Sequence, residues 1–199
     1  EHAGAVSWMY LSIAVVFFSF QIYCDFSGYS DIAIGAARVM GFRLMENFKL
    51  PYRSPGVGMF WSKWHISLST WFRDYVYIPL GGNRKGVFNT YLFLFITMLV
   101  GGLWHGADWR FVFWGMAHGI ALILHKGWTH FFPKQSEKWY YKILGIIITF
   151  HFVGILWIFF RATSFESAFL SINQIFTATS WIDFQGFWMT RPEVMYLLA

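Results

Sequence analysis

The sequence predicts an all-α fold, a polytopic bundle in which several helices cross a membrane. Of its 199 residues, 57% are hydrophobic and only 13% are charged. A soluble globular domain carries roughly 25% charged residues, about twice this share. Several apolar segments also approach the roughly 20 residues that a helix needs to cross the hydrocarbon. The 12 Trp and 10 Tyr suit side chains at lipid–water interfaces, so a lipid bilayer is the expected environment.

The apolar segments place the expected spans. They lie at residues 3–24, 87–107, 109–124 and 141–160. The third is short for a crossing, and a fifth span is expected to begin at Val194. Residues 29–42 are rich in Ala and Gly, which favours a helix packed closely inside the bundle. With no internal repeat and no signal peptide, residues 1–199 are interpreted as one domain fragment of a longer protein.

The basic residues indicate an orientation. Eight of the 15 Lys and Arg lie between Arg38 and Lys85, and four more lie within residues 126–142. Because cytoplasmic connections carry an excess of Lys and Arg, we expect residues 43–86 and 126–142 in the cytoplasm. The turn at 107–109 is then on the other side. The net charge of +5 follows from this topology, and without a basic recognition motif no nucleic-acid binding is expected.

Residues 57–79 have an amphipathic pattern. On a helical wheel their large apolar side chains share one face, and Lys63, Arg73 and Asp74 lie opposite. This pattern predicts a helix over about residues 57–76 that lies along the membrane interface or packs against the bundle, within a fold that has interfacial amphipathic and re-entrant helices. His65 falls at the edge of the apolar face, where it would look into the protein.

His105 is the first candidate for chemistry. It follows an apolar segment in the string GGLWHGADW, with glycines on both sides that remove side-chain bulk. A neutral imidazole tolerates such a setting and accepts a proton near neutral pH, so His105 suits a general base. The alternative is a histidine hydrogen-bonded between helices, although ionisable residues inside membranes favour a functional role.

Four further residues have two interpretations each. His65 is either a partner of His105 or an anchor of the interfacial helix. His118, in GMAHG, is either a packing residue or a supporting one. Asp25 either lines a substrate tunnel or caps a helix. Asp31 is expected to cap a helix that begins near Ser30.

The string PLGGNRKG offers a weak binding site. Its cations Arg84 and Lys85 could hold a phosphate-bearing donor, or they form a plain cytoplasmic turn. No pair of histidines has the H-x-x-x-H spacing, and Cys24 is the only cysteine. Neither a metal site nor an intrachain disulfide is therefore expected.

Four strings together resemble a known family. FSGYSDIAIGAARVMGF, FWSKWHISLSTWFRDYVYIPLGGNRKG, GGLWHGADWRFVFWGMAHG and WIFFRATSFESA are similar to the membrane-bound O-acyltransferase family, in the family's order, from residue 25 to about 170. Within it they resemble the bacterial branch that acetylates alginate and peptidoglycan. The resemblance implies the C-terminal half of a bundle of around ten or more helices.

The resemblance also implies residue roles. His105 matches the family's catalytic histidine, His65 its second active-site histidine and His118 a supporting one. Family members hold these histidines in or beside a tunnel that joins the two membrane faces. The residues expected to support them or to line this tunnel are Asp25, Lys63, Trp64 and Trp104.

The implied activity is acyl transfer across a bacterial inner (cytoplasmic) membrane by a multi-pass protein. An acyl group, expected to be acetyl, would pass from a cytoplasmic thioester to an extracytoplasmic polysaccharide. The thioester, either acetyl-CoA or a carrier-protein thioester, is a co-substrate, and no bound cofactor is expected. The resemblance further implies an extracytoplasmic SGNH-type acetyltransferase as partner.

Three alternatives stay open. The chain could move D-alanine to teichoic acid, although WIFFRATSFESA and the GADW turn favour acetylation. It could be a non-enzymatic acyl conduit or scaffold for a soluble acetyltransferase, which would release no thiol. It could be an ion or proton transporter, which would show flux without donor dependence.

Overall fold

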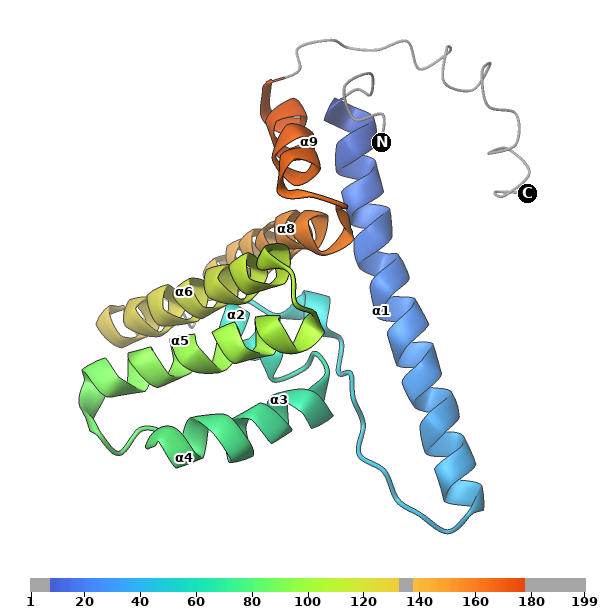
Figure 1. Cartoon of the computed structure of the whole chain (residues 1–199), viewed down its shortest axis with the longest axis vertical. Coiled ribbons are helices and arrows are strands. Elements are labelled where there is room, and N and C mark those ends of the chain that lie inside the picture. The colour runs from blue at the N-terminus through green and yellow to red at the C-terminus, as the bar shows by residue number, and fades with distance from the viewer. Residues whose placement is uncertain (1–7, 133–137, 178–199) are drawn as a thin grey trace.

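The computed structural model describes residues 8–132 and 138–177, and every regular element within them is a helix. This confirms the all-α fold class. The elements are α1 (Trp8–Val39), a 3₁₀ turn η2 (Pro51–Arg53), α2 (Val57–Trp61), α3 (Ile66–Phe72), a π-helical turn η3 (Arg73–Tyr77), α4 (Ile78–Leu80), α5 (Gly86–His105), α6 (Trp109–Phe131), α8 (Trp139–Arg161) and α9 (Phe165–Thr177). In Figure 1, α5, α6 and α8 lie side by side, α1 passes their ends, and α9 packs against α1 and α8.

Three of the described helices are long and apolar enough to cross a membrane, namely α1, α5 and α8. The expected spans at 87–107 and 141–160 correspond to α5 and α8. The expected span at 109–124 is the first part of α6, which has 23 residues but is less apolar. Helix α6 contacts both α5 and α8 and buries His118, whereas Lys126 and His130 near its end are exposed. The expected start at Val194 lies outside the described residues.

Helix α1 differs from the expectation. The sequence predicts a span ending near Cys24 and a separate helix over 29–42, whereas the structure has one continuous helix of 32 residues. Asp31 therefore lies inside a helix, exposed, and does not cap one, so that prediction is wrong. The physical reason is that extending a helix adds one hydrogen bond per residue, whereas starting a new one is costly. No proline interrupts this stretch.

The predicted continuous helix over 57–76 is also wrong. The structure breaks it after Trp61, and a new helix begins at Ile66. The backbone of the break pairs with an earlier loop instead: the N–H of Lys49 donates to the carbonyl of Lys63 at 3.0 Å. The break also turns Trp64 into the core, where it packs on Trp157 at a ring separation of 5.3 Å. Burial of this indole explains why the chain leaves the regular helix.

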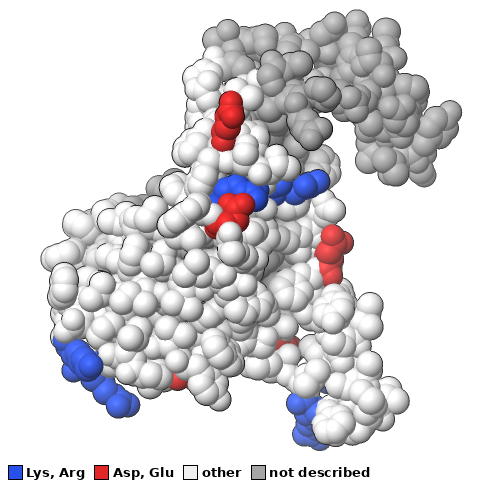
Figure 2. Space-filling model, viewed as in Figure 1, with Lys and Arg blue, Asp and Glu red and all other residues white. Residues whose placement is uncertain are grey.

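Most charged side chains lie near helix ends or in the connections between helices, whereas Asp25 and Asp31 lie inside α1. Figure 2 shows basic residues gathered at the lower left, over the α4–α5 turn, and at the lower right, beside the end of α1 and the loop that follows it. A broad uncharged surface lies between them and the charges near α9. Both lower groups fall in the part of the chain that the excess of Lys and Arg assigns to the cytoplasm.

Helices α5 and α6 form a hairpin whose backbones meet at two glycines. A Cβ atom added to Gly115 would clash with the carbonyl oxygen of Met98 and lie 3.1 Å from the Cα atom of Gly102. Both glycines are buried. Small residues allow helices in membranes to approach until their backbones touch. This contact therefore fixes the distance between the two helices.

We predict that Gly115→Ala destabilises the full-length protein by about 1–3 kcal/mol, because the added methyl group overpacks the α5–α6 contact. The matched control is Gly127→Ala in the same helix, where an added Cβ atom meets nothing within 4 Å. This control should be neutral or slightly stabilising, since Ala favours helix over Gly. Thermal unfolding of the purified proteins in detergent measures both. Equal melting temperatures for the two variants would contradict the prediction that α5 and α6 are in close contact at Gly115.

Candidate active site

His105 is the last residue of α5, and its ring is enclosed by aromatic side chains from three helices. The ring centroid lies 5.0 Å from that of Trp104, 5.2 Å from Trp114 of α6 and 5.1 Å from Phe160 of α8. Within residues 8–132 and 138–177, no side chain or backbone group makes a hydrogen bond to this imidazole. The described residues thus hold the ring by packing alone and leave both nitrogens for other partners.

His65 lies in the break between α2 and α3, with a left-handed backbone (φ 46°). The edge of its ring meets Phe26 of α1 at 4.6 Å, and Trp104 lies 6.5 Å away. Burial, and secondarily the nearby His105, lower the pKa of His65 to about 4. The imidazole is therefore neutral at physiological pH. Trp104 contacts both histidine rings and so brings the two predicted active-site residues to one place.

A cavity of about 650 Å³ extends along α5 and α6 and reaches His105. Along α6 its lining runs from Trp114 to Thr129, which at 1.5 Å per residue is roughly 22 Å. His105 and Trp114 lie at one end, and Asn83 and Lys126 lie at the other. His65 and His118 do not line it. The cavity is therefore a long, mostly apolar slot with a histidine at one end and a cation at the other.

The sequence did not lead us to predict the polar end of the cavity. Lys126 Nζ lies 3.5 Å from Asn83 Oδ1, and within the described chain no carboxylate pairs with this lysine. Arg73 also lines the cavity, but its guanidinium is paired with Asp74 at 2.8 Å. The available signal was periodicity, because Leu122, His125, Lys126 and Thr129 share one face of α6.

The two cations that the sequence singled out lie elsewhere. Arg84 and Lys85 are exposed and do not line the cavity, and the ammonium of Lys85 packs over the ring of Phe93 at 5.8 Å. The Gly-rich turn around them closes the α4–α5 connection. The structure therefore favours the interpretation of this string as a plain turn.

His118 is fully buried next to this cavity. Its Nδ1 accepts a hydrogen bond from Trp61 Nε1 at 3.3 Å, so the hydrogen of the neutral ring resides on Nε2. Its ring packs on Trp114 at 4.7 Å, and Trp114 in turn touches His105. Among the described residues, His118 Nε2 and Trp114 Nε1 have no acceptor. His118 is thus one aromatic ring away from His105, a position suited to support.

The other predicted tunnel residues do not line the described cavity. Trp64 is a core residue, Lys63 lies half-buried in the break, and Asp25 is exposed on α1. Trp104 is more than half exposed, between the two histidines. Their contribution to a tunnel of a larger bundle stays a prediction. The described residues contain no group of three His, Cys, Asp or Glu that could hold a metal ion.

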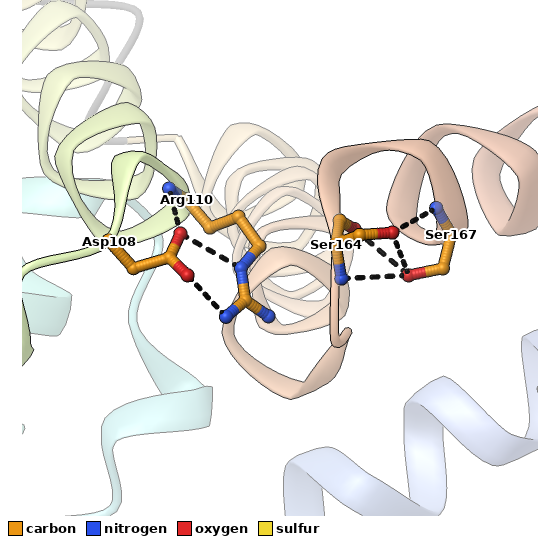
Figure 3. Close-up of polar contacts among 4 residues, drawn as sticks. All are labelled: Asp108, Arg110, Ser164 and Ser167. Carbon is orange, nitrogen blue, oxygen red and sulfur yellow. Dashed lines mark hydrogen bonds and ion pairs between the residues drawn. The ribbon is translucent and has the colours of Figure 1, made fainter.

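The turn after His105 is fixed by a fork of hydrogen bonds (Figure 3). Asp108 Oδ1 accepts from the backbone N–H of Arg110 at 2.8 Å, and both carboxylate oxygens accept from its guanidinium. These bonds cap α6 and lower the pKa of Asp108 to about 2. In the facing loop, Ser164 and Ser167 cap α9 reciprocally, each backbone N–H donating to the other hydroxyl at 3.1 Å. These bonds fix the starts of α6 and α9.

Several known proteins are similar in sequence to this chain. "Probable alginate O-acetylase AlgI" of Pseudomonas putida is 48% identical over 164 residues, which cover 81% of this chain and 32% of the relative. The peptidoglycan O-acetyltransferase of Helicobacter pylori is 42% identical over 171 residues, which cover 84% and 32%. The teichoic acid D-alanyltransferase of Bacillus subtilis is 34% identical over 152 residues, which cover 68% and 37%.

The chain spans about a third of the length of these relatives. The sequence model of the membrane-bound O-acyltransferase family matches residues 4–169, a range that contains His65, His105, His118 and every residue that lines the cavity. This match extends over most of the chain and agrees with the resemblance inferred from its four strings. The chain belongs to the membrane-bound O-acyltransferase family.

Proposed function

We propose that the protein is an O-acyltransferase that moves an acetyl group from a cytoplasmic thioester to a hydroxyl of an extracytoplasmic polysaccharide. The observation that carries the proposal is the slot that the α5–α6 hairpin forms with α2, α3 and η3, which runs from Lys126 to His105. Its volume of about 650 Å³ falls in the range of small-molecule sites, roughly 300–1,000 Å³. The acetyl group is favoured because the relatives with higher identity are named as O-acetylating proteins.

The two ends of the slot suit the two ends of a thioester donor. Acetyl-CoA and carrier-protein thioesters both place a phosphate at one end of a thin arm and the acyl group at the other. Lys126, which contacts Asn83 and the ring of Tyr91 but no described carboxylate, offers a cation for the phosphate, and the apolar walls suit the arm. The excess of Lys and Arg in residues 126–142 predicts that this end opens to the cytoplasm.

His105 is proposed as the general base. One of its nitrogens takes the proton of the acceptor hydroxyl while that oxygen attacks the thioester carbonyl carbon. The C–S bond then breaks, and the leaving thiolate recovers the proton from the imidazolium, so an ester and a free thiol result. The turn after His105 is predicted to lie on the extracytoplasmic side. The acceptor polysaccharide would approach from this side. An SGNH-type partner enzyme would also act there. A bacterial inner membrane is the proposed location.

D-alanyl transfer to teichoic acid is the second candidate, because a teichoic acid D-alanyltransferase is 34% identical to this chain. Incubating the full-length protein with labelled acetyl and D-alanyl thioesters separates the two, since only the true donor is turned over. A conduit or scaffold that leaves the chemistry to a soluble enzyme would release no thiol from either donor.

We predict that His105→Ala in the full-length protein lowers acyl transfer by about 10²–10⁴-fold, the typical contribution of a general base. Membrane insertion should persist, because His105 makes no hydrogen bond within the described chain. The control is His151→Ala, which removes an exposed histidine of α8 and should leave transfer unchanged. Release of labelled thiol and acetylation of the polysaccharide are the two readouts. Full transfer by the His105 variant would rule out this mechanism.

We further predict that Lys126→Gln raises the KM for the phosphate-bearing donor about tenfold, the effect of losing roughly 1.5 kcal/mol of charge-assisted binding. The rate at saturating donor should change little, because Lys126 lies at the far end of the slot from His105. Lys142→Gln is the matched control, since Lys142 is exposed on α8 and does not line the slot. Steady-state kinetics with varied donor test this prediction. An unchanged KM would place the phosphate elsewhere.

A further inference from the structure

His65 occupies a backbone position that needs outside support. It is the residue that precedes α3, and its φ of 46° is left-handed, a conformation that residues with a side chain adopt rarely. A residue at this place usually caps the helix with its own side chain, but His65 makes no such bond. The first N–H groups of α3 therefore need another acceptor.

Asn47 supplies that acceptor from a distant loop. Its backbone carbonyl accepts from the N–H of Ile66 at 3.0 Å, and its Oδ1 accepts from the N–H of Ser67 at 3.0 Å. Its Nδ2 donates to the hydroxyl of Ser30 on α1 at 3.3 Å. Asn47 thus caps α3 in place of His65 and ties the cap to α1. The imidazole of His65 is released from capping and faces Phe26 and Trp104 instead.

Ser67 connects this cap to the imidazole. Its hydroxyl donates its single hydrogen to Asn47 Oδ1 at 2.7 Å. The same oxygen lies 3.5 Å from His65 Nδ1, at the long end of a hydrogen bond. Since that hydrogen is already used, Ser67 Oγ can only accept from the ring, and Nδ1 must carry a hydrogen. A neutral His65 then has its lone pair on Nε2.

We propose that Asn47 and Ser67 are positioning residues that hold His65 in its left-handed conformation and fix its Nδ1–H tautomer, so that Nε2 is presented as a proton or hydrogen-bond acceptor. Within the described chain, Ser67 Oγ is the one polar atom within hydrogen-bonding distance of the His65 ring. The other near neighbours are the aromatic rings of Phe26 and Trp104, which do not select a tautomer. The catalytic meaning of this arrangement rests on the proposed acyl transfer, whereas the tautomer does not.

The test removes only the hydroxyl that orients the ring. Ser67→Ala keeps the backbone N–H that Asn47 caps, so α3 should still form. Ser67→Thr restores a hydroxyl at the same place. Ser12→Ala is the matched control, because the Ser12 hydroxyl donates to a carbonyl of its own helix, far from this network. Full-length protein with ¹⁵N-labelled histidine is compared by NMR, and the His65 signals are assigned by their loss in His65→Gln.

In the parent protein and in the Ser12 variant, the His65 signals should show a protonated Nδ1 and an unprotonated Nε2. Ser67→Ala should shift them towards the other tautomer, and Ser67→Thr should restore them. In acyl-transfer kinetics, Ser67→Ala should lower kcat about fivefold, with KM unchanged within about twofold.

Two results would overturn the proposal: a parent His65 with its hydrogen on Nε2, or parental signals and kcat in Ser67→Ala. Absence of acyl transfer in the parent would count against the proposed function alone. The NMR comparison would still decide the tautomer in that case.

Discussion

The close contact between Gly102 of α5 and Gly115 of α6 is the constraint on which the site depends. Because these backbones touch, Trp114, one residue before the contact, is brought against the ring of His105 at the end of α5. The two helices form one wall of the slot that ends near Lys126, and residues of α2, α3 and η3 form the other. A side chain at either glycine would move the aromatic wall away from the histidine. The same packing therefore sets both the enclosure of the base and the space for a ligand.

The break between α2 and α3 positions the second histidine, His65. A continuous helix would place His65 at the edge of its apolar face, whereas the break lets the chain turn Trp64 into the core and His65 towards Trp104. The hydrogen bonds that the break costs are recovered by the loop that contains Asn47. The chain thus loses helical hydrogen bonds within residues 62–65 and gains contacts between segments that are distant in the sequence. Such departures from regular geometry are common at functional sites.

The sequence predicts well what depends on local composition. Apolar length alone located α5 and α8, and the glycines around His105 indicated a crowded histidine. Prediction from the sequence fails where contacts with residues far away along the chain determine the local structure. The break at residues 62–65 follows from pairing with the loop that contains Asn47 and Lys49, and helical periodicity cannot report such a partner. Lys126 was taken as a topology signal, because only the packing of α6 on α5 shows that it borders a cavity.

The asymmetry of the slot bears on how the donor and the acceptor would meet. Its walls are mostly apolar, so carrying a phosphate past Lys126 would strip water from a charge without a new partner. A thin neutral arm meets no such cost, and the roughly 16 Å from Leu94 to His105 along α5 suits an arm rather than a whole nucleotide. The charged part of the donor would then stay at its own side of the membrane, and only the acyl group would travel. We infer that this separation, more than the basicity of His105, determines from which side each substrate can react.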